Sequence, residues 1–583
     1  MKKILILVLT LLAMAMLLSI PAFAGESDAV LKVQYDAETK EFSVFDDGWN
    51  FAMETAKTGK EVTVTLLKDW IAEDGQFTDE FINGAGFDYD AIYFAKDVKM
   101  TLDLNGHTID RGLTGGEPNG EVMFISNNAT VTIKNGTIKG GCSTNGAGGI
   151  HIEDANVTLL DLVFTDNVVG NDDGAALQHI DGGELYIKNC RFENNRGTVS
   201  GFDVYGTVFL SDVDKVVIED SYFGNNENID YGAGIYATSI PDFKIQNCTF
   251  ENLHAGDRGG AIWVSGLDHS MFVYNCTFKN NSCGNYGGAI YTSAANLYIY
   301  DSTFTSNSAD WDGGAIYFNG AIMADRSVAS YLYRCTFDGN KAGWSGGALF
   351  LNNGTMGIRD TTSVYSYGCT FENNSAEGDG GAVYIDGDCL FRLSSDSESG
   401  KPAIIKNNMA EDAGGGIFVE KQLYMPACEL SLAGEVYVCD NVSSLGADDI
   451  YAENGRHITM YEAITSPAGS IGIRLADVED DIACHISDDL RNPSITAFFT
   501  NNEGYELKLG LSLLDGDYVK LTKSAVVGSI FSEGSVSMLV SLAALIVAVA
   551  GMGVTMSLKK KLQLVASANT ANTAGTADTA DKE

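Results

Sequence analysis

The sequence predicts an all-β fold: a right-handed parallel β-helix solenoid with N- and C-terminal caps and one C-terminal transmembrane helix. Three observations support this fold class. A unit recurs every 26 to 34 residues, its apolar residues alternate over short runs, and polar or glycine residues stand between the runs. No run between these corners keeps a 3.6-residue period, which excludes a helical solenoid.

Each repeat is anchored by one large apolar residue, numbered here as position zero. Asn follows at +3 in nine of the eleven repeats, a small-residue cluster at +9 to +11, an aliphatic residue at +12 and usually an aromatic residue at +13. Corners at −3, +3 and +9/+10 predict three strands per turn, stacked about 4.8 Å apart, with the Asn side chains bonded from turn to turn. The anchors are Ile138, Phe164, Phe192, Phe223, Phe250, Phe278, Phe304, Phe337, Phe371, Ile405 and Val438.

The two ends of the chain have the features of an exported, anchored protein. A basic start, an apolar run and Ala22-Phe23-Ala24 are typical of a secretory signal. Lys559-Lys560-Lys561 after a long uncharged run predicts a cytoplasmic C-terminus. The predicted parts are a signal peptide (1–24), an N-terminal cap with the first irregular coils (25–137), the repeats (138–451), a C-terminal β cap (452–526), a transmembrane helix (536–557) and a short cytoplasmic tail (558–583). We therefore expect a single-pass cell-surface protein with an extracellular N-terminal ectodomain.

The net charge argues against some classes of partner, and the cysteine positions argue against a disulfide framework. The net charge of −41, from 37 basic and 78 acidic residues, argues against nucleic acid as a partner and fits a soluble, exposed rod. Five of the eleven cysteines share position −2 with Ser221 and Ser302, which predicts small buried side chains rather than a disulfide framework. They are Cys190, Cys248, Cys276, Cys335 and Cys369.

The two recurring motifs, FxxN and GGA(I/L/V), carry a resemblance. They stand as "FTSN" followed by "GGAI" and as "FENN" followed by "GGAV", in fixed register over about 138–451. In this the chain resembles the chlamydial polymorphic membrane proteins and related adhesin-like right-handed β-helix proteins. The resemblance implies adhesion or display at a cell surface.

Catalysis is not the expected role, and no catalytic residue is predicted. Asp172 and Asp173 are adjacent, but neighbours on a strand point to opposite faces, and no basic or histidine motif accompanies them. A polysaccharide lyase or glycoside hydrolase on a pectate-lyase-like β-helix stays open as an alternative, as does a purely structural role in surface display.

Calcium is the one cofactor to consider. Asp310, Asp312, Glu377 and Asp379 recur near one corner and could offer oxygen ligands, although Trp344 and its neighbours interrupt the row. A solvated corner is the simpler interpretation, so no cofactor is expected.

Aromatic columns are the best candidates for binding. Tyr231, Tyr286, Trp311 and Trp344 stand at +7 or +8, where a corner should expose them, and Tyr317 stands in a column at +13 that alternation turns outward. Aromatic side chains repeated along a rod could contact a polysaccharide or the surface of a host or neighbouring cell. The leading prediction is a non-enzymatic, surface-anchored protein for adhesion or glycan binding.

Overall fold

The computed structural model describes residues 28–72, 91–113, 120–144, 146–170, 174–198, 203–266, 270–320, 328–352, 362–387, 389–420, 429–453, 458–476, 482–486, 494–503, 505–511 and 517–523. The chain divides into two compact units, Met1–Thr522 and Lys523–Glu583, and the elements below lie in the first as far as Thr522. The predicted signal peptide, transmembrane helix and tail fall outside the described residues. Among those described, no helix is long and apolar enough to span a bilayer.

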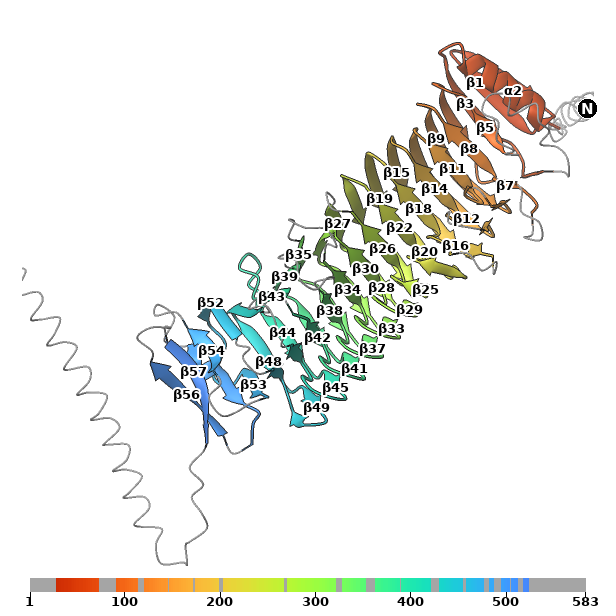
Figure 1. The fold of residues 1–583 in the computed structure, drawn as a ribbon. Helices are drawn as coiled ribbons and strands as arrows, with labels where there is room; N and C mark the ends of the chain where they lie inside the picture. Colours follow the sequence, from red (N-terminus) through yellow and green to blue (C-terminus); the bar gives the residue numbers. More distant parts are fainter. Residues whose placement is uncertain are drawn as a thin grey trace, which may run out of the picture. The chain divides into compact units, whose positions relative to one another are not determined.

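The turns of a parallel β-helix are stacked along the first unit (Figure 1). One turn consists of β30 (Ile290–Ser293), β31 (Asn296–Tyr300), β32 (Thr303–Thr305) and β33 (Ser308–Ala309). Corresponding strands of successive turns pair in parallel, so β30 lies between β26 (Ile262–Ser265) and β34 (Ile316–Asn319). The prediction of three strands per turn was wrong: there are four, because a two-residue strand follows the Asn corner and pairs in a ladder of its own.

The strands form four ladders, numbered in the order in which a turn passes through them. Ladder 1 contains β5 (Ile92–Phe94), β8 (Met123–Ser126), β11 (Ile150–Glu153), β14 (Leu177–Ile180), β18 (Val208–Ser211), β22 (Ile235–Thr238), β26 (Ile262–Ser265), β30, β34 (Ile316–Asn319), β38 (Leu349–Asn352), β42 (Val383–Ile385), β46 (Ile417–Val419) and β51 (Ile450–Ala452). Ladder 2 contains β3 (Glu61–Leu66), β6 (Lys99–Asp103), the first halves of β9 (Thr130–Lys139) and β12 (Asn156–Thr165), β15 (Glu184–Lys188), β19 (Lys215–Glu219), β23 (Phe243–Gln246), β27 (Ser270–Tyr274), β31, β35 (Val328–Tyr333), β39 (Thr362–Tyr367), β43 (Cys389–Ser394), β47 (Glu429–Gly434) and β52 (Ile458–Ile464).

Ladders 3 and 4 complete the turn. Ladder 3 contains β4 (Trp70–Ile71), β7 (Thr108–Asp110), the second halves of β9 and β12, β16 (Arg191–Glu193), β20 (Tyr222–Gly224), β24 (Thr249–Glu251), β28 (Thr277–Lys279), β32, β36 (Thr336–Asp338), β40 (Thr370–Glu372), β44 (Ala403–Lys406) and β48 (Val436–Cys439). Ladder 4 contains β10 (Cys142–Ser143), β13 (Val168–Val169) and β17 (Arg196–Gly197) as one sheet, then β21 (Ile229–Tyr231), β25 (His254–Arg258), β29 (Ser282–Cys283), β33, β37 (Lys341–Ala342), β41 (Ser375–Ala376), β45 (Met409–Ala410), β49 (Val442–Ser443) and β50 (Gly446–Ala447).

Both ends of the β-helix are covered by other elements. At the N-terminal end, β1 (Leu31–Tyr35) pairs antiparallel with β2 (Glu38–Phe42) and β3, and α2 (Phe45–Ala56) packs beside them (Figure 1). Trp49 of α2 is buried, with its ring 5.0 Å from that of Phe94, so α2 covers this end of the core. The C-terminal end contains β53 (Ile471–Leu475), β54 (Ile482–Ile486), the short 3₁₀ helix η3 (Ser494–Ala497), β55 (Phe498–Thr500), β56 (Tyr505–Leu511) and β57 (Asp517–Lys523).

The position-zero residues lie in one register through the core, as predicted. Each pairs with its counterpart in the next turn, from Ile138 with Phe164 to Ile405 with Val438. Between Phe164 and Phe371 the rings stack with centroids 4.6 to 4.9 Å apart and are fully buried. Each stacked pair adds about 0.5–1.5 kcal/mol to the effect of burial.

The Asn residues at +3 form a buried ladder beside this stack. Asn307 donates from Nδ2 to Asn340 Oδ1 at 2.9 Å and to the carbonyl oxygen of Phe278 at 3.0 Å. The same Asn340 Oδ1 accepts the backbone N–H of Asn307 at 3.0 Å, so one amide satisfies several corner groups. The row ends at Asp449, whose Oδ1 accepts the backbone N–H and Nδ2 of Asn441 at 2.9 and 3.0 Å.

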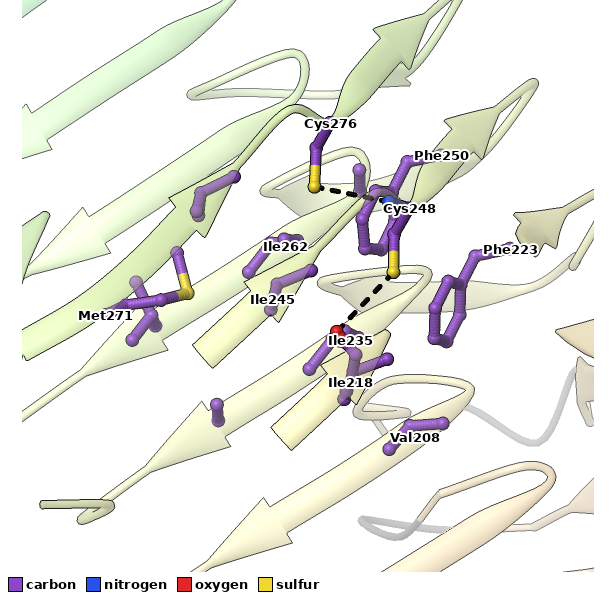
Figure 2. Close-up of a cluster of buried hydrophobic side chains, with 14 of the residues drawn as sticks. Val208, Ile218, Phe223, Ile235, Ile245, Cys248, Phe250, Ile262, Met271 and Cys276 are labelled. Carbon is purple, nitrogen blue, oxygen red and sulfur yellow. Dashed lines mark hydrogen bonds between the residues drawn. The ribbon is translucent and has the colours of Figure 1, made fainter. Parts of the chain in front are cut away.

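The position −2 column, of which Figure 2 shows Cys248 and Cys276, explains the exchange of Cys and Ser. The Cys248 backbone N–H donates to Cys276 Sγ at 3.4 Å, and the Cys276 N–H donates in the same way to Ser302 Oγ at 3.0 Å. A thiol and a hydroxyl thus have the same role here. The five cysteines of this column are free and buried, which confirms the prediction of small buried side chains at this position. Burial raises the pKa of Cys190 to about 12.

Candidate functional site

Five residues form a continuous column at the corner between ladder 4 and ladder 1, called here the corner column: Asn285, Trp311, Trp344, Gly378 and Asp412. Each of the last four donates its backbone N–H to the carbonyl oxygen of the preceding member of the column, at 3.1, 2.8, 2.7 and 3.1 Å in turn. These hydrogen bonds place the residues one above another on successive turns.

Trp311 and Trp344 are the exposed aromatic residues of this column. Trp311 is 42% and Trp344 60% exposed, and their rings stack with centroids 5.1 Å apart and planes 12° apart. A side chain buried in a core would stabilise the fold by removing apolar area from water, but these two leave much of theirs in solvent. An exposed pair of large aromatic rings of this kind is typical of an interaction site.

Tyr231 and Tyr286 belong to a second column, which the sequence did not separate from the first. Tyr231 pairs with Arg258 between β21 and β25, and isolated bridges connect Arg258 with Tyr286 and Tyr286 with Asp312. Both tyrosines are half-buried. The Tyr286 ring still meets Trp311 edge-on, with centroids 5.9 Å apart, so it borders the tryptophan pair, whereas Tyr231 lies two turns before Tyr286.

Tyr317 is not a surface residue, contrary to the prediction of an outward, exposed ring. It is only 6% exposed, because the half-buried Tyr286 packs against it with ring centroids 4.7 Å apart. Its Oη accepts a hydrogen bond from Asn352 Nδ2 at 2.6 Å, and burial raises its pKa. The +13 column therefore stabilises ladder 1. Tyr317 is no longer a candidate for contact with a ligand, because it is buried.

The acidic residues considered for calcium are mostly engaged within the fold. Asp312 Oδ1 accepts the N–H of Ser345 and Asp379 Oδ1 that of Ala413, both at 2.9 Å, while Glu377 pairs with Lys341 at 2.6 Å. Desolvation by burial raises the pKa of Asp312 to about 6, and that of Asp379 likewise to about 6. Asp310 is exposed.

Metal binding by this row stays a hypothesis. In the part of the chain that the structure describes, no group of three or more His, Cys, Asp or Glu residues is placed to hold a metal ion.

A polar hollow near the N-terminal end bears on the enzyme alternative. It encloses about 360 Å³ and includes Asp110, Lys139, Asp166 and Arg196 in its lining. Lys139 Nζ lies 3.2 Å from Asp110 Oδ2, so one carboxylate is already paired with one cation. Asp172 and Asp173 lie outside the described residues.

Ladder 2 contains an aromatic surface that the sequence reasoning missed. Eight half-buried rings at positions −6 and −4 form two parallel columns, with stacked centroids 4.8 to 5.0 Å apart. They are Phe272, Tyr298, Tyr331 and Tyr365 in one column and Tyr274, Tyr300, Tyr333 and Tyr367 in the other. Alternation around the buried −5 residue would have revealed them. Because ring faces cover one another along each column, mainly ring edges and hydroxyls face outward.

Comparison with known proteins agrees with this geometry. The model of the right handed beta helix region matches residues 121–304 and 231–431, which together span more than half of the chain. The chain belongs to the right-handed β-helix family. A segment of 200 residues is also 28% identical to the "Probable autotransporter YfaL" of Escherichia coli (strain K12), covering 30% of this chain and 16% of that protein. The match thus spans about a sixth of that relative's length. The resemblance to the chlamydial proteins stays a prediction.

Proposed function

We propose that this β-helix is a cell-surface protein that binds glycans through the corner column, without catalysing a reaction. The observation that carries the proposal is the exposed, stacked pair of Trp311 and Trp344 on a rigid ladder. Exposed indole rings bind sugars because the apolar face of a pyranose ring packs on them, and a rigid support limits the entropy lost on binding. The name of the autotransporter relative and the acidic, repetitive sequence support a place at the cell surface.

The stacking limits how a glycan can bind. With centroids 5.1 Å apart, the two indoles leave no room for a sugar ring between them, since stacked groups need about 3.5–4.0 Å on each side. A chain of sugars therefore cannot stack on one indole after another along the rod. It contacts the exposed edges of both rings and the outer face of the last one.

A glycan array tests this proposal. The purified full-length chain and its Trp311→Ala/Trp344→Ala variant are applied to the same array. We expect the wild type to bind at least one glycan class and the variant to lose that signal. A variant that binds as well as the wild type would exclude the corner column as the binding surface.

The polar hollow of Asp110, Lys139, Asp166 and Arg196 is the observation that favours an enzyme instead. Two carboxylates and two cations lie near each other there, as acid–base catalysis on a polysaccharide requires. The Lys139–Asp110 pair, however, removes one carboxylate and one cation from that set. Release of unsaturated oligosaccharide from a polyuronate by the wild type, lost in Arg196→Ala, would establish the lyase and overturn the non-enzymatic proposal.

A further inference from the structure

The outer face of Trp344 is directed at a gap in the corner column. One face of its indole lies against Trp311, so the other is directed toward the next turn, where Gly378 follows in the column. The Gly378 N–H donates to the Trp344 carbonyl oxygen at 2.7 Å, which makes the two residues direct neighbours. Glycine has no side chain, so the stack ends at Trp344 and its outer face stays open to solvent, in agreement with its 60% exposure.

Asp412 is the next residue of the corner column beyond this gap. Its backbone N–H donates to the Gly378 carbonyl oxygen at 3.1 Å, so it stands two turns beyond Trp344. Two strand spacings correspond to about 10 Å along the column. A sugar ring in contact with the indole takes about 4 Å of that length and leaves its substituents within reach of the Asp412 carboxylate. We call this space between Trp344 and Asp412 the slot.

The charges around the slot are mainly negative. Glu377, Glu411 and Asp412 come from the two turns that follow Trp344, and all three are exposed. Lys341 is the cation facing them, and its Nζ is already 2.6 Å from Glu377 Oε1. A uronate would bring a further negative charge into this field, whereas a cation would be attracted both by the carboxylates and by the π face of the indole.

We infer that the slot binds a sugar ring carrying a protonated amine, such as a unit of a glucosamine polymer. This inference rests on the proposed glycan-binding function and names its substrate class. The ring packs on Trp344 over Gly378, and its ammonium group faces the carboxylate of Asp412. Acetylation of the amine removes the charge, so the N-acetylated sugar binds more weakly.

Calorimetric titration of the full-length chain with three hexasaccharides tests this inference. The probes are oligomers of glucosamine, N-acetylglucosamine and galacturonate, at a mildly acidic pH that keeps the amine protonated. We expect the glucosamine oligomer to bind at least about tenfold more tightly than the other two, and its affinity to fall with added salt.

Two tyrosine substitutions locate the site. Gly378→Tyr continues the stack and fills the slot with the protein's own ring. A side chain is conformationally allowed there, because its φ is not left-handed, although an added Cβ would lie 3.0 Å from the Trp344 carbonyl oxygen. Lys279→Tyr is the control, because it adds a ring at an exposed position of ladder 3, outside the corner column. We expect about tenfold weaker binding in the first variant and unchanged binding in the second.

Asp412→Asn keeps the shape of the slot and removes one negative charge. It therefore tests the inference even if Gly378→Tyr fails to fold. We expect it to weaken binding of the glucosamine oligomer alone. Equal affinity of this variant and the wild type, or equal affinity for glucosamine and N-acetylglucosamine oligomers, would overturn the amino-sugar inference. In either case, if Trp344→Ala still loses glycan binding, the proposed glycan-binding function stands and only the amino-sugar preference is refuted. A glycan array without any signal would overturn both.

Discussion

Asp312 tests the role of burial at this corner, because its carboxylate is buried and has no cationic partner among the residues that the structure describes. It is 9% exposed, and desolvation is the main cause that raises its pKa from 3.8 to about 6. Asn in its place would still accept the Ser345 N–H, which lies 2.9 Å from Oδ1, and would carry no charge. We therefore expect Asp312→Asn to stabilise the fold at neutral pH.

The size of this effect follows from the pKa shift. A rise from 3.8 to about 6 is roughly two units, which corresponds to a cost of at most about 3 kcal/mol for the ionised form. Because the folded pKa is the higher one, the contribution of the acid to stability is fully present below about pH 4 and is lost as the pH rises through about 6. The gain from Asp312→Asn should thus appear above about pH 6 and vanish near pH 4.

Thermal unfolding near pH 4 and at neutral pH measures this gain in stability, with Asp310→Asn as the matched control. Asp310 is exposed, so its substitution removes the same formal charge without relieving burial. We expect a clear rise in Tm for Asp312→Asn at neutral pH and little change for the control. A gain of equal size at both pH values, or one matched by Asp310→Asn, would refute the burial argument.

Three further predictions concern the scaffold. Asn340→Ala leaves several buried groups of the Asn ladder without hydrogen-bond partners, each at a cost of about 1–3 kcal/mol. In denaturant titration the free energy of unfolding should therefore fall by about 3–6 kcal/mol, whereas the exposed control Lys279→Ala should change it little. Tyr333→Ala removes two stacked contacts, with centroids 4.8 and 4.9 Å away, so a loss of about 1–3 kcal/mol is expected, and a neutral result would show that this surface is not structural. The free energy of unfolding of Cys248→Ser should lie within about 1 kcal/mol of the wild-type value, because Ser302 has the same role two turns further along the chain. A much larger loss would contradict the equivalence of Cys and Ser in this column.

Much of the fold could be predicted because its periodicity is a direct consequence of stacking. The anchors from Ile138 to Val438 pair in the predicted register, since each must lie above its counterpart to fill one narrow core. The Asn ladder followed from the same logic. The fourth strand was missed because two residues such as Ser308–Ala309 are too short to show any alternation.

The candidate site was predicted less well, because it depends on strand pairing and on which segments cover which side chains. Trp311 and Tyr286 differ by one position within the repeat, and that single residue separates two columns, which only the strand pairing distinguishes. Tyr317 has the alternation of an outward residue, but the corner packs over it. Alternation predicts the face on which a side chain lies and not whether another segment covers that face.

The central claim is that the Trp311–Trp344 pair is a glycan-binding surface. Its most direct test is the dissociation constant of the full-length chain for the strongest ligand on the array, compared between the wild type and Trp311→Ala/Trp344→Ala. The account predicts at least about tenfold weaker binding in the variant, which should still fold because neither ring is buried in the core. Equal dissociation constants in two folded proteins would contradict it.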